Sequence, residues 1–270
     1  MFDNPFLLHT LLAGCGAALT GGIIGSYVVV KRVVSISGSI AHSVLGGMGI
    51  CLWLKIKFGL TFLTPFIGAL IAGIISAMLM GWIHLKYKER EDTAIAAIWA
   101  IGMSIGVIFI ALTPGYNTEL IDFLFGNILW VSRGDIFLLF ALNALILSIV
   151  IRFYKPLLAI CFDEEQAKLK QLPVEAFYFL LLSLVAISIV LLIQIVGAIL
   201  VVTMLAIPAA IAAIFTRSLL QMMVLATACG LVLTFVGILL SYQLNWPPGA
   251  TISLVSSSCY AGALLFKKKS

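Results

Sequence analysis

The sequence predicts an all-α polytopic membrane protein that crosses the bilayer about nine times as a single domain over residues 1–270. Hydrophobic residues make up 63% of the chain and charged residues 10%, whereas a soluble domain carries about 25% charged residues. Apolar runs long enough to span a bilayer as helices recur along the whole chain. Strands with alternating apolar and polar residues are absent from the sequence, which argues against a membrane barrel.

The apolar runs define the expected spans in order. They cover approximately residues 6–30, 33–54, 60–82, 93–113, 135–153, 176–196, 197–216, 218–241 and 249–266. A break in the 195–215 region would change the number of spans, so eight or ten are alternatives. Residues 116–134 mix Glu119, Asp122 and Arg133 with apolar side chains, which indicates an interfacial or re-entrant segment.

The distribution of positive charge predicts the orientation, because short loops rich in Lys and Arg stay in the cytoplasm. With the N-terminus outside and the C-terminus cytoplasmic, thirteen of the sixteen Lys and Arg residues fall on the cytoplasmic side. They are Lys31, Arg32, Lys86, Lys88, Arg90, Arg152, Lys155, Lys168, Lys170, Arg217, Lys267, Lys268 and Lys269. Lys55, Lys57 and Arg133 remain outside.

The second expected span carries an ionisable side chain, His42, among serines and glycines. An ionisable group within a span is a candidate functional site, and a neutral imidazole binds divalent transition metals. Ser39, Ser43 and Gly46 lie near His42 and are candidates for lining a polar path. The alternative is a structural histidine that hydrogen-bonds to Ser39 or Ser43.

Two other stretches are candidates for function. Residues 160–172 form the main cytoplasmic connection, in which acidic residues precede basic ones as the helix dipole favours. This short amphipathic helix either docks into a partner or is a solvated connector. Residues 196–213 combine small residues and Thr203 with Pro208, which permits a bend, as in a path-lining helix or a kinked packing helix.

Taken together and in this order, these stretches resemble the integral membrane permease of zinc, manganese and iron ABC importers, the ABC-3 family. The resemblance covers nearly the whole chain. It is carried by residues 28–33, 41–42 with 45 and 47, 92–95 with 99–103, 125–129, 162–167, 197–200 with 207–210, and 241–242 with 248–251.

The resemblance implies a homodimer of permeases in the cell membrane of a prokaryote, with cytoplasmic ATPase subunits and an extracytoplasmic metal-binding protein. It implies that the segment around His42 lines the translocation path and that residues 163–171 form the coupling helix. The residues expected to contact the ATPase are Asp163, Glu164, Glu165, Gln166 and Lys168. Glu119 and Asp122 are outer-face candidates for attracting cations or docking the binding protein.

The chain departs from this family at one position. Many members carry an Asp four residues before the histidine, and here that residue is Gly38. His42 is therefore the expected metal contact, and its second ligand is not identified. Since zinc favours nitrogen ligands and manganese tolerates oxygen, this departure favours zinc slightly over manganese and iron. The metal is cargo, and no permanently bound cofactor is expected.

Other function classes fit the sequence less well. The chain has no Walker-type phosphate loop, so it is expected to be a permease without its own ATPase site and not an enzyme. An ABC permease for a metal chelate is the nearest alternative. A proton- or sodium-coupled transporter would carry ionisable residues in several spans, and an intramembrane protease would need motifs that are missing here. Nothing in the sequence predicts binding to nucleic acid.

Overall fold

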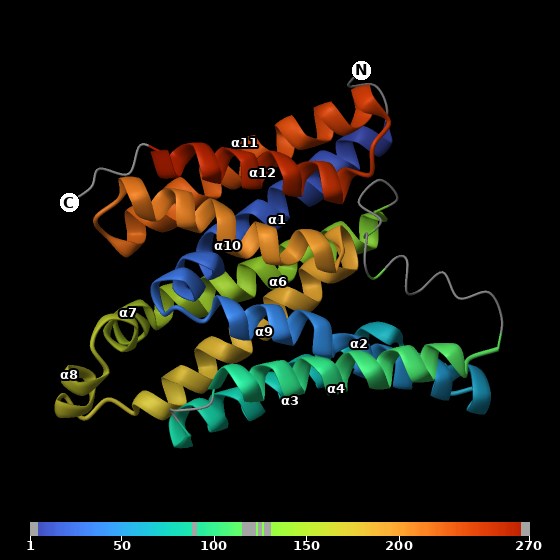
Figure 1. Ribbon diagram of the computed structural model, residues 1–270, viewed down its shortest axis with the longest axis horizontal. Helices are drawn as coiled ribbons and strands as arrows, with labels where there is room; N and C mark the ends of the chain where they lie inside the picture. The colour runs from blue at the N-terminus through green and yellow to red at the C-terminus, as the bar shows by residue number, and fades with distance from the viewer. Residues whose placement is uncertain (1–4, 88–90, 115–122, 124–125, 127–130, 266–270) are drawn as a thin grey trace.

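The computed structural model describes residues 5–87, 91–114, 123, 126 and 131–265, and these residues form α-helices and no strands (Figure 1). The helices are α1 (Pro5–Val30), α2 (Val34–Phe58), α3 (Pro65–Lys86), α4 (Glu91–Ala111), α6 (Arg133–Arg152), α7 (Tyr154–Phe162), α8 (Glu164–Leu169), α9 (Val174–Val196), α10 (Ala198–Phe215), α11 (Leu219–Leu244) and α12 (Pro248–Leu265). The prediction of an all-helical protein is confirmed.

Eight of the described helices are long and apolar enough to cross a membrane. They match the first eight expected spans to within a few residues. The ninth expected span is also a helix, α12, but it is not among these eight. The start of α1 and the end of α12 lie at opposite ends of the bundle, and α7 and α8 project at the end where α12 stops (Figure 1).

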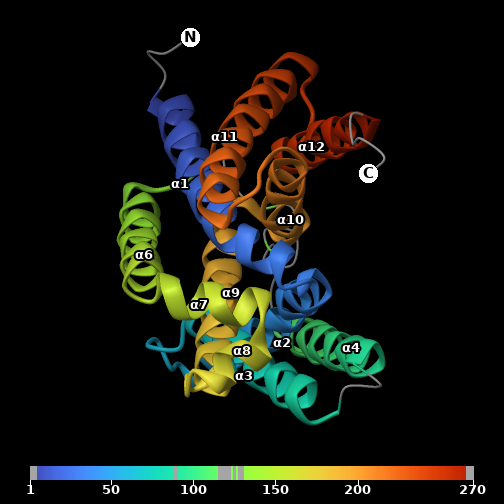
Figure 2. The same cartoon turned by 90° about the vertical axis from the view of Figure 1, so that its left-hand side faces the viewer.

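The long helices form two groups around α9. Figure 2 shows α2, α3 and α4 on one side of α9, and α1, α10, α11 and α12 on the other. Helix α9 contacts members of both groups. Its apolar side chains are buried over most of its length, and this span has the highest mean hydropathy of the eight.

Helix α2 packs against α4 through paired glycines. A Cβ atom on Gly46 would lie 2.8 Å from the carbonyl oxygen of Gly102, and one on Gly49 would lie 2.7 Å from that of Gly106. Real Cβ atoms do not approach other atoms this closely, so glycine is required at these positions. In a bilayer, where apolar surface gains little from leaving lipid, such close contact between backbones is a main source of helix association.

The opposite side of α2 packs against α3 in the same way. A Cβ atom on Gly47 would lie 2.1 Å from the carbonyl oxygen of Gly68, and one on Gly68 would lie 2.2 Å from that of Gly47. Helix α2 is therefore held between α3 and α4 by backbone contact on two faces. Gly38 differs from these glycines, because no described atom outside the backbone of its own helix lies within 4 Å of the position of its missing Cβ.

The expected break in the 195–215 region lies at Gly197, between α9 and α10. Its backbone angles, φ 82° and ψ 162°, belong to a region that only glycine enters readily. Gly126 also has a positive φ of 70°, and a Cβ there would collide with the backbone of Val196 and Gly197. Pro208 lies inside α10 without ending it. The break therefore stems from Gly197 rather than from the proline.

Two substitutions on α2 test this packing. We expect Gly47→Val to lower the free energy of unfolding by about 3 kcal/mol, because the added atoms overlap the backbone of α3. Gly38→Ala, where space is open, should raise it by roughly 0.5–1 kcal/mol by removing a helical glycine. Thermal or denaturant unfolding in detergent measures both. Equal effects of the two substitutions would contradict the packing described here.

Candidate functional site

His42 lies on α2, two turns from the start of the helix, and its ring stacks on the indole of Trp99 from α4. The ring centroids are 4.8 Å apart and the planes differ by 13°. The indole nitrogen of Trp99 points toward the sulfur of Met103, 2.9 Å away. The Nδ1 atom of His42 is buried and has no hydrogen-bond partner among the described residues. The stacking therefore orients an imidazole whose Nδ1 atom is not used by the fold.

The serines near His42 are used in helix packing. The Ser39 hydroxyl donates to the carbonyl oxygen of Ile95 on α4, at 2.8 Å. The Ser43 hydroxyl is 3.0 Å from the Ile40 carbonyl oxygen and 2.8 Å from the Ser76 hydroxyl of α3. Neither serine bonds to His42, so the structural alternative for the histidine, a hydrogen bond to Ser39 or Ser43, is not what the structure has.

Gly38 lies one helical turn before His42 on the same face of α2. Both residues are half-buried. Residues four apart on a helix are neighbours, so a side chain at position 38 would lie beside the imidazole. A Cβ atom at Gly38 would meet no described atom of a neighbouring helix within 4 Å, so the start of a side chain is accommodated there. The departure from the acidic residue is therefore not a steric consequence of the packing around α2.

Thr203, the expected path residue on α10, is half-buried, and its hydroxyl lies 3.4 Å from the carbonyl oxygen of Ile199. Helices α2 and α10 contact each other, but no hydrogen bond joins Thr203 to His42 among the described residues. Gly46 lies in the close contact with α4 described above. Across the described chain, no cluster of three or more His, Cys, Asp or Glu side chains could hold a metal ion.

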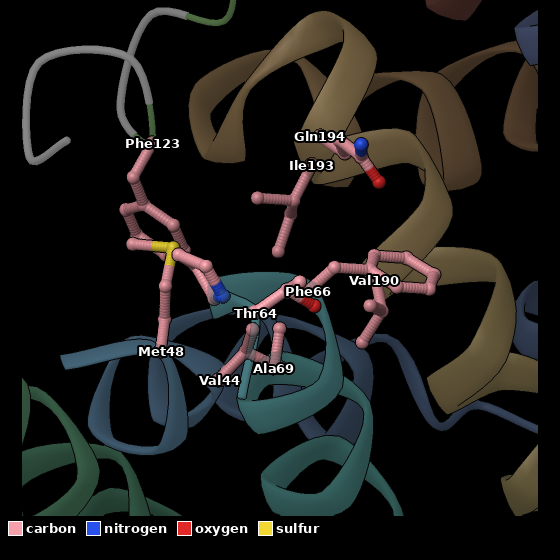
Figure 3. Close-up of a pocket in the computed structure, with 10 residues that line it drawn as sticks. Val44, Met48, Thr64, Phe66, Ala69, Phe123, Val190, Ile193 and Gln194 are labelled. Carbon is pink, nitrogen blue, oxygen red and sulfur yellow. The ribbon is translucent and has the colours of Figure 1, made fainter. Parts of the chain in front are cut away.

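A cavity of about 300 Å³ lies on another side of α2, between α2, α3 and α9. Figure 3 shows Met48 and Phe123 together on one side of this cavity and Val190 with Ile193 on the other. Its polar lining comes from Thr64 and Gln194. His42 does not line this cavity. The outer-face candidates Glu119 and Asp122 lie outside the described residues.

The connection that the sequence places in the cytoplasm contains two short helices, α7 and α8, rather than one. Asp163 separates them and accepts a hydrogen bond from the backbone N–H of Gln166 at 2.8 Å, which caps α8. Glu165, Gln166 and Lys168 are exposed, and Ala167 packs inward. Two large apolar side chains also project from this segment: Phe162 is 66% exposed and Leu169 is 85% exposed.

Glu164 differs from the other acidic residues of this segment, because it points into the protein. Its carboxylate forms an ion pair with Lys31, whose side chain is only 11% exposed. Burial disfavours the charged carboxylate, but the hydrogen bond and charge of Lys31, with His84 and Lys168, hold the pKa of Glu164 below its usual value. Glu164 is thus an internal contact of α8.

The sequence prediction missed several of these residues as site components. Trp99 lies in one of the family-like stretches, yet its stacking on His42 depends on how α2 and α4 pack. Lys31 was counted only as a cytoplasmic charge. Phe162 and Leu169 could have been noticed as large apolar residues in a polar connection.

A family model and several related proteins, all of them from transport systems, match nearly the whole chain. Residues 3–267 match the model of the ABC 3 transport family. A probable metal transport system membrane protein of Chlamydia pneumoniae is 47% identical over 99% of this chain and 91% of its own length. The manganese transport system membrane protein MntC of Halalkalibacterium halodurans is 33% identical over 100% of this chain and 90% of its own.

Solved structures share the fold. The PsaBC complex of Streptococcus pneumoniae contains a chain with a TM-score of 0.86 and 30% identity, covering 98% of this chain and 93% of that one. A metal-chelate type ABC transporter in an inward-facing conformation has a TM-score of 0.70 at 20% identity, which shows the shared fold alone. On the extent of the family match and of these relatives, this chain belongs to the ABC 3 transport family.

Proposed function

We propose that this chain is the membrane permease of an ABC importer for a divalent first-row metal ion, and that His42 contacts the ion on its path. The observation that carries this proposal is the buried Nδ1 atom of His42, which lacks a partner in the described residues while its ring is held by Trp99. Membership of the ABC 3 transport family and the names of the relatives support it.

The chemistry at His42 follows from the imidazole. In the tautomer that carries its proton on Nε2, Nδ1 offers a lone pair to a metal ion, while the ion keeps water on its other sides. One protein ligand binds weakly, and weak binding suits transport because the ion must leave again. A homodimer would supply a second His42 from the partner copy. The open space beside Gly38 would admit water at this point of the path.

The relatives bear on the choice of metal. The relatives that are named manganese transport system membrane protein MntC are 33% identical to this chain. Manganese accepts oxygen ligands readily, so water can supply the oxygen that Gly38 does not. We therefore propose manganese as the first ion to test, in place of the slight preference for zinc drawn from Gly38. A metal chelate remains the second candidate substrate, because ABC permeases for chelates are the nearest alternative to which the sequence points.

Energy would enter through α7 and α8. In the proposed arrangement two cytoplasmic ATPase subunits bind Phe162 and the exposed face of α8, and an extracytoplasmic metal-binding protein delivers the ion at the opposite end of the bundle. Exposed apolar surface rimmed by polar residues marks sites of protein–protein interaction. We therefore assign the anchoring role to Phe162 and Leu169, with Glu165, Gln166 and Lys168 as the polar rim. The ATPase activity belongs to the partner subunits.

The first experiment measures uptake of manganese, zinc and iron into vesicles that contain the whole transporter. We expect His42→Ala to reduce uptake of the transported ion by at least about ten-fold, because its protein ligand on the path is lost. His9→Ala, which removes the histidine of α1, is the matched control and should leave uptake unchanged. Undiminished uptake of all three ions by His42→Ala would remove His42 from the path.

A second experiment adds the missing carboxylate. We expect Gly38→Asp to fold normally and to retain metal roughly ten-fold more tightly, because a carboxylate one turn from His42 provides a second ligand. Metal content after desalting, measured by mass spectrometry, reports retention. Gly38→Asn, of similar size but without charge, is the control. Identical retention by both variants would show that position 38 does not face the ion.

A third experiment tests the ATPase contact. Leu169→Glu replaces an exposed apolar anchor by a charge and should weaken co-purification of the ATPase subunits by about ten-fold or more, as loss of an interface anchor does. Lys155→Glu, at the start of α7, controls for the added negative charge. If Leu169→Glu retained the ATPase as well as Lys155→Glu does, Leu169 would not be an anchor.

A further inference from the structure

Lys31 lies in the three-residue connection between α1 and α2, and its side chain reaches into the cytoplasmic segment. The Nζ atom donates to the carbonyl oxygen of Ile160, at 2.9 Å, near the end of α7. It also donates to Glu164 Oε1 in the first turn of α8. Its third contact is the ring of Tyr178 on α9, whose centroid is 5.6 Å away. One ammonium group therefore joins the connection before α2 to α7, α8 and α9.

This ammonium group is well protected from water. The Lys31 side chain is 11% exposed and that of Glu164 is 33% exposed. Lys31 and Glu164 form the single ion pair among the described residues. Charges in such a position are strongly destabilising when one partner is removed, so the two residues are expected to stay paired as α8 moves.

The connection that carries Lys31 is short and is closed by backbone hydrogen bonds. The backbone N–H of Arg32 bonds to the carbonyl oxygen of Val29, and that of Val33 bonds to the carbonyl oxygen of Val28. With Arg32 in the left-handed region at φ 61°, these bonds form a Schellman motif that closes α1. Val33 is buried, and α2 begins at the next residue. A displacement of Lys31 is therefore passed directly to the start of α2.

The same cluster also touches α3. The ring of His84, in the last turn of α3, stacks on Tyr178 with centroids 5.0 Å apart and planes 27° apart. Helix α3 is bound to α2 through Gly47 and Gly68. Both helices of this close pair thus meet the cytoplasmic segment near Lys31.

We propose that Lys31 is a positioning residue that transmits movement of the α7–α8 segment to α2, and hence to His42, through its ion pair with Glu164. This inference rests on the proposed function, because it requires that α8 receives the movement of an ATPase. It separates two roles within one short helix. The outward side chains bind the ATPase, and Glu164 on the inward side passes the movement on.

The test uses the whole transporter, reconstituted with its ATPase subunits and metal-binding protein, and measures metal uptake and ATP hydrolysis together. We expect Lys31→Met and Glu164→Gln each to lower the metal moved per ATP hydrolysed by about ten-fold, the usual size of a coupling effect. ATPase co-purification and ATP hydrolysis should persist. Lys155→Met, which removes an exposed lysine outside any ion pair in the described chain, is the matched control.

Two further variants test whether Lys31 and Glu164 act through one shared contact. Lys31→Met combined with Glu164→Gln should lower the metal moved per ATP hydrolysed no further than either change alone, since both remove the same contact. Lys31→Glu combined with Glu164→Lys should recover part of the lost coupling by restoring the pair in reverse. Additive losses, or an unchanged ratio of metal to ATP in both single variants, would overturn the inference.

The outcome also distinguishes this inference from the proposed function. If the wild-type complex moved no metal or bound no ATPase, the proposed function itself would fail. If the wild type transported metal and Lys31→Met matched Lys155→Met, the permease role would stand and the role of Lys31 would fall. Loss of ATPase binding in Glu164→Gln would place Glu164 on the partner surface instead, and would also refute the proposal.

Discussion

The contact of glycine backbones on two faces of α2 is the constraint on which the rest of this structure depends. Apolar side chains gain little from leaving lipid, so the position of α2 is set by how closely its backbone approaches those of α3 and α4. Gly47 against Gly68, and Gly46 against Gly102, allow this approach. The contact with α4 is what brings Trp99 onto the ring of His42.

The same packing explains why the polar residues of α2 have different roles. Ser39 and Ser43 face the neighbouring helices, and their hydroxyl groups bond across the interfaces with α4 and α3. Gly38 and His42 share the face that these helices leave partly open. The polar character of the span therefore serves helix association at some positions and leaves one imidazole nitrogen for a ligand at another.

The α7–α8 segment shows a comparable division within a few residues. Phe162 and Leu169 project outward from the α7–α8 segment, while Glu164 turns inward to Lys31. Because a short turn closed by backbone hydrogen bonds joins Lys31 to α2, the segment is connected to the helix of His42 by one ion pair and one backbone motif. A machine that must transmit movement benefits from such a short connection, since each flexible link would dissipate part of the displacement.

Much of this organisation could be predicted from the sequence, because apolar length and charge placement act locally. The helices, the boundary between two spans at Gly197 and the short helix after Asp163 follow from residues close together in the chain. The pairing of Lys31 with Glu164 and the stacking of Trp99 on His42 could not be predicted in this way. They join residues far apart in sequence, whose meeting depends on which glycine faces allow two backbones to touch. The roles of Ser39 and Gly38 likewise depended on that packing, since a serine and a glycine on one helix look equally available until the neighbouring helices are in place.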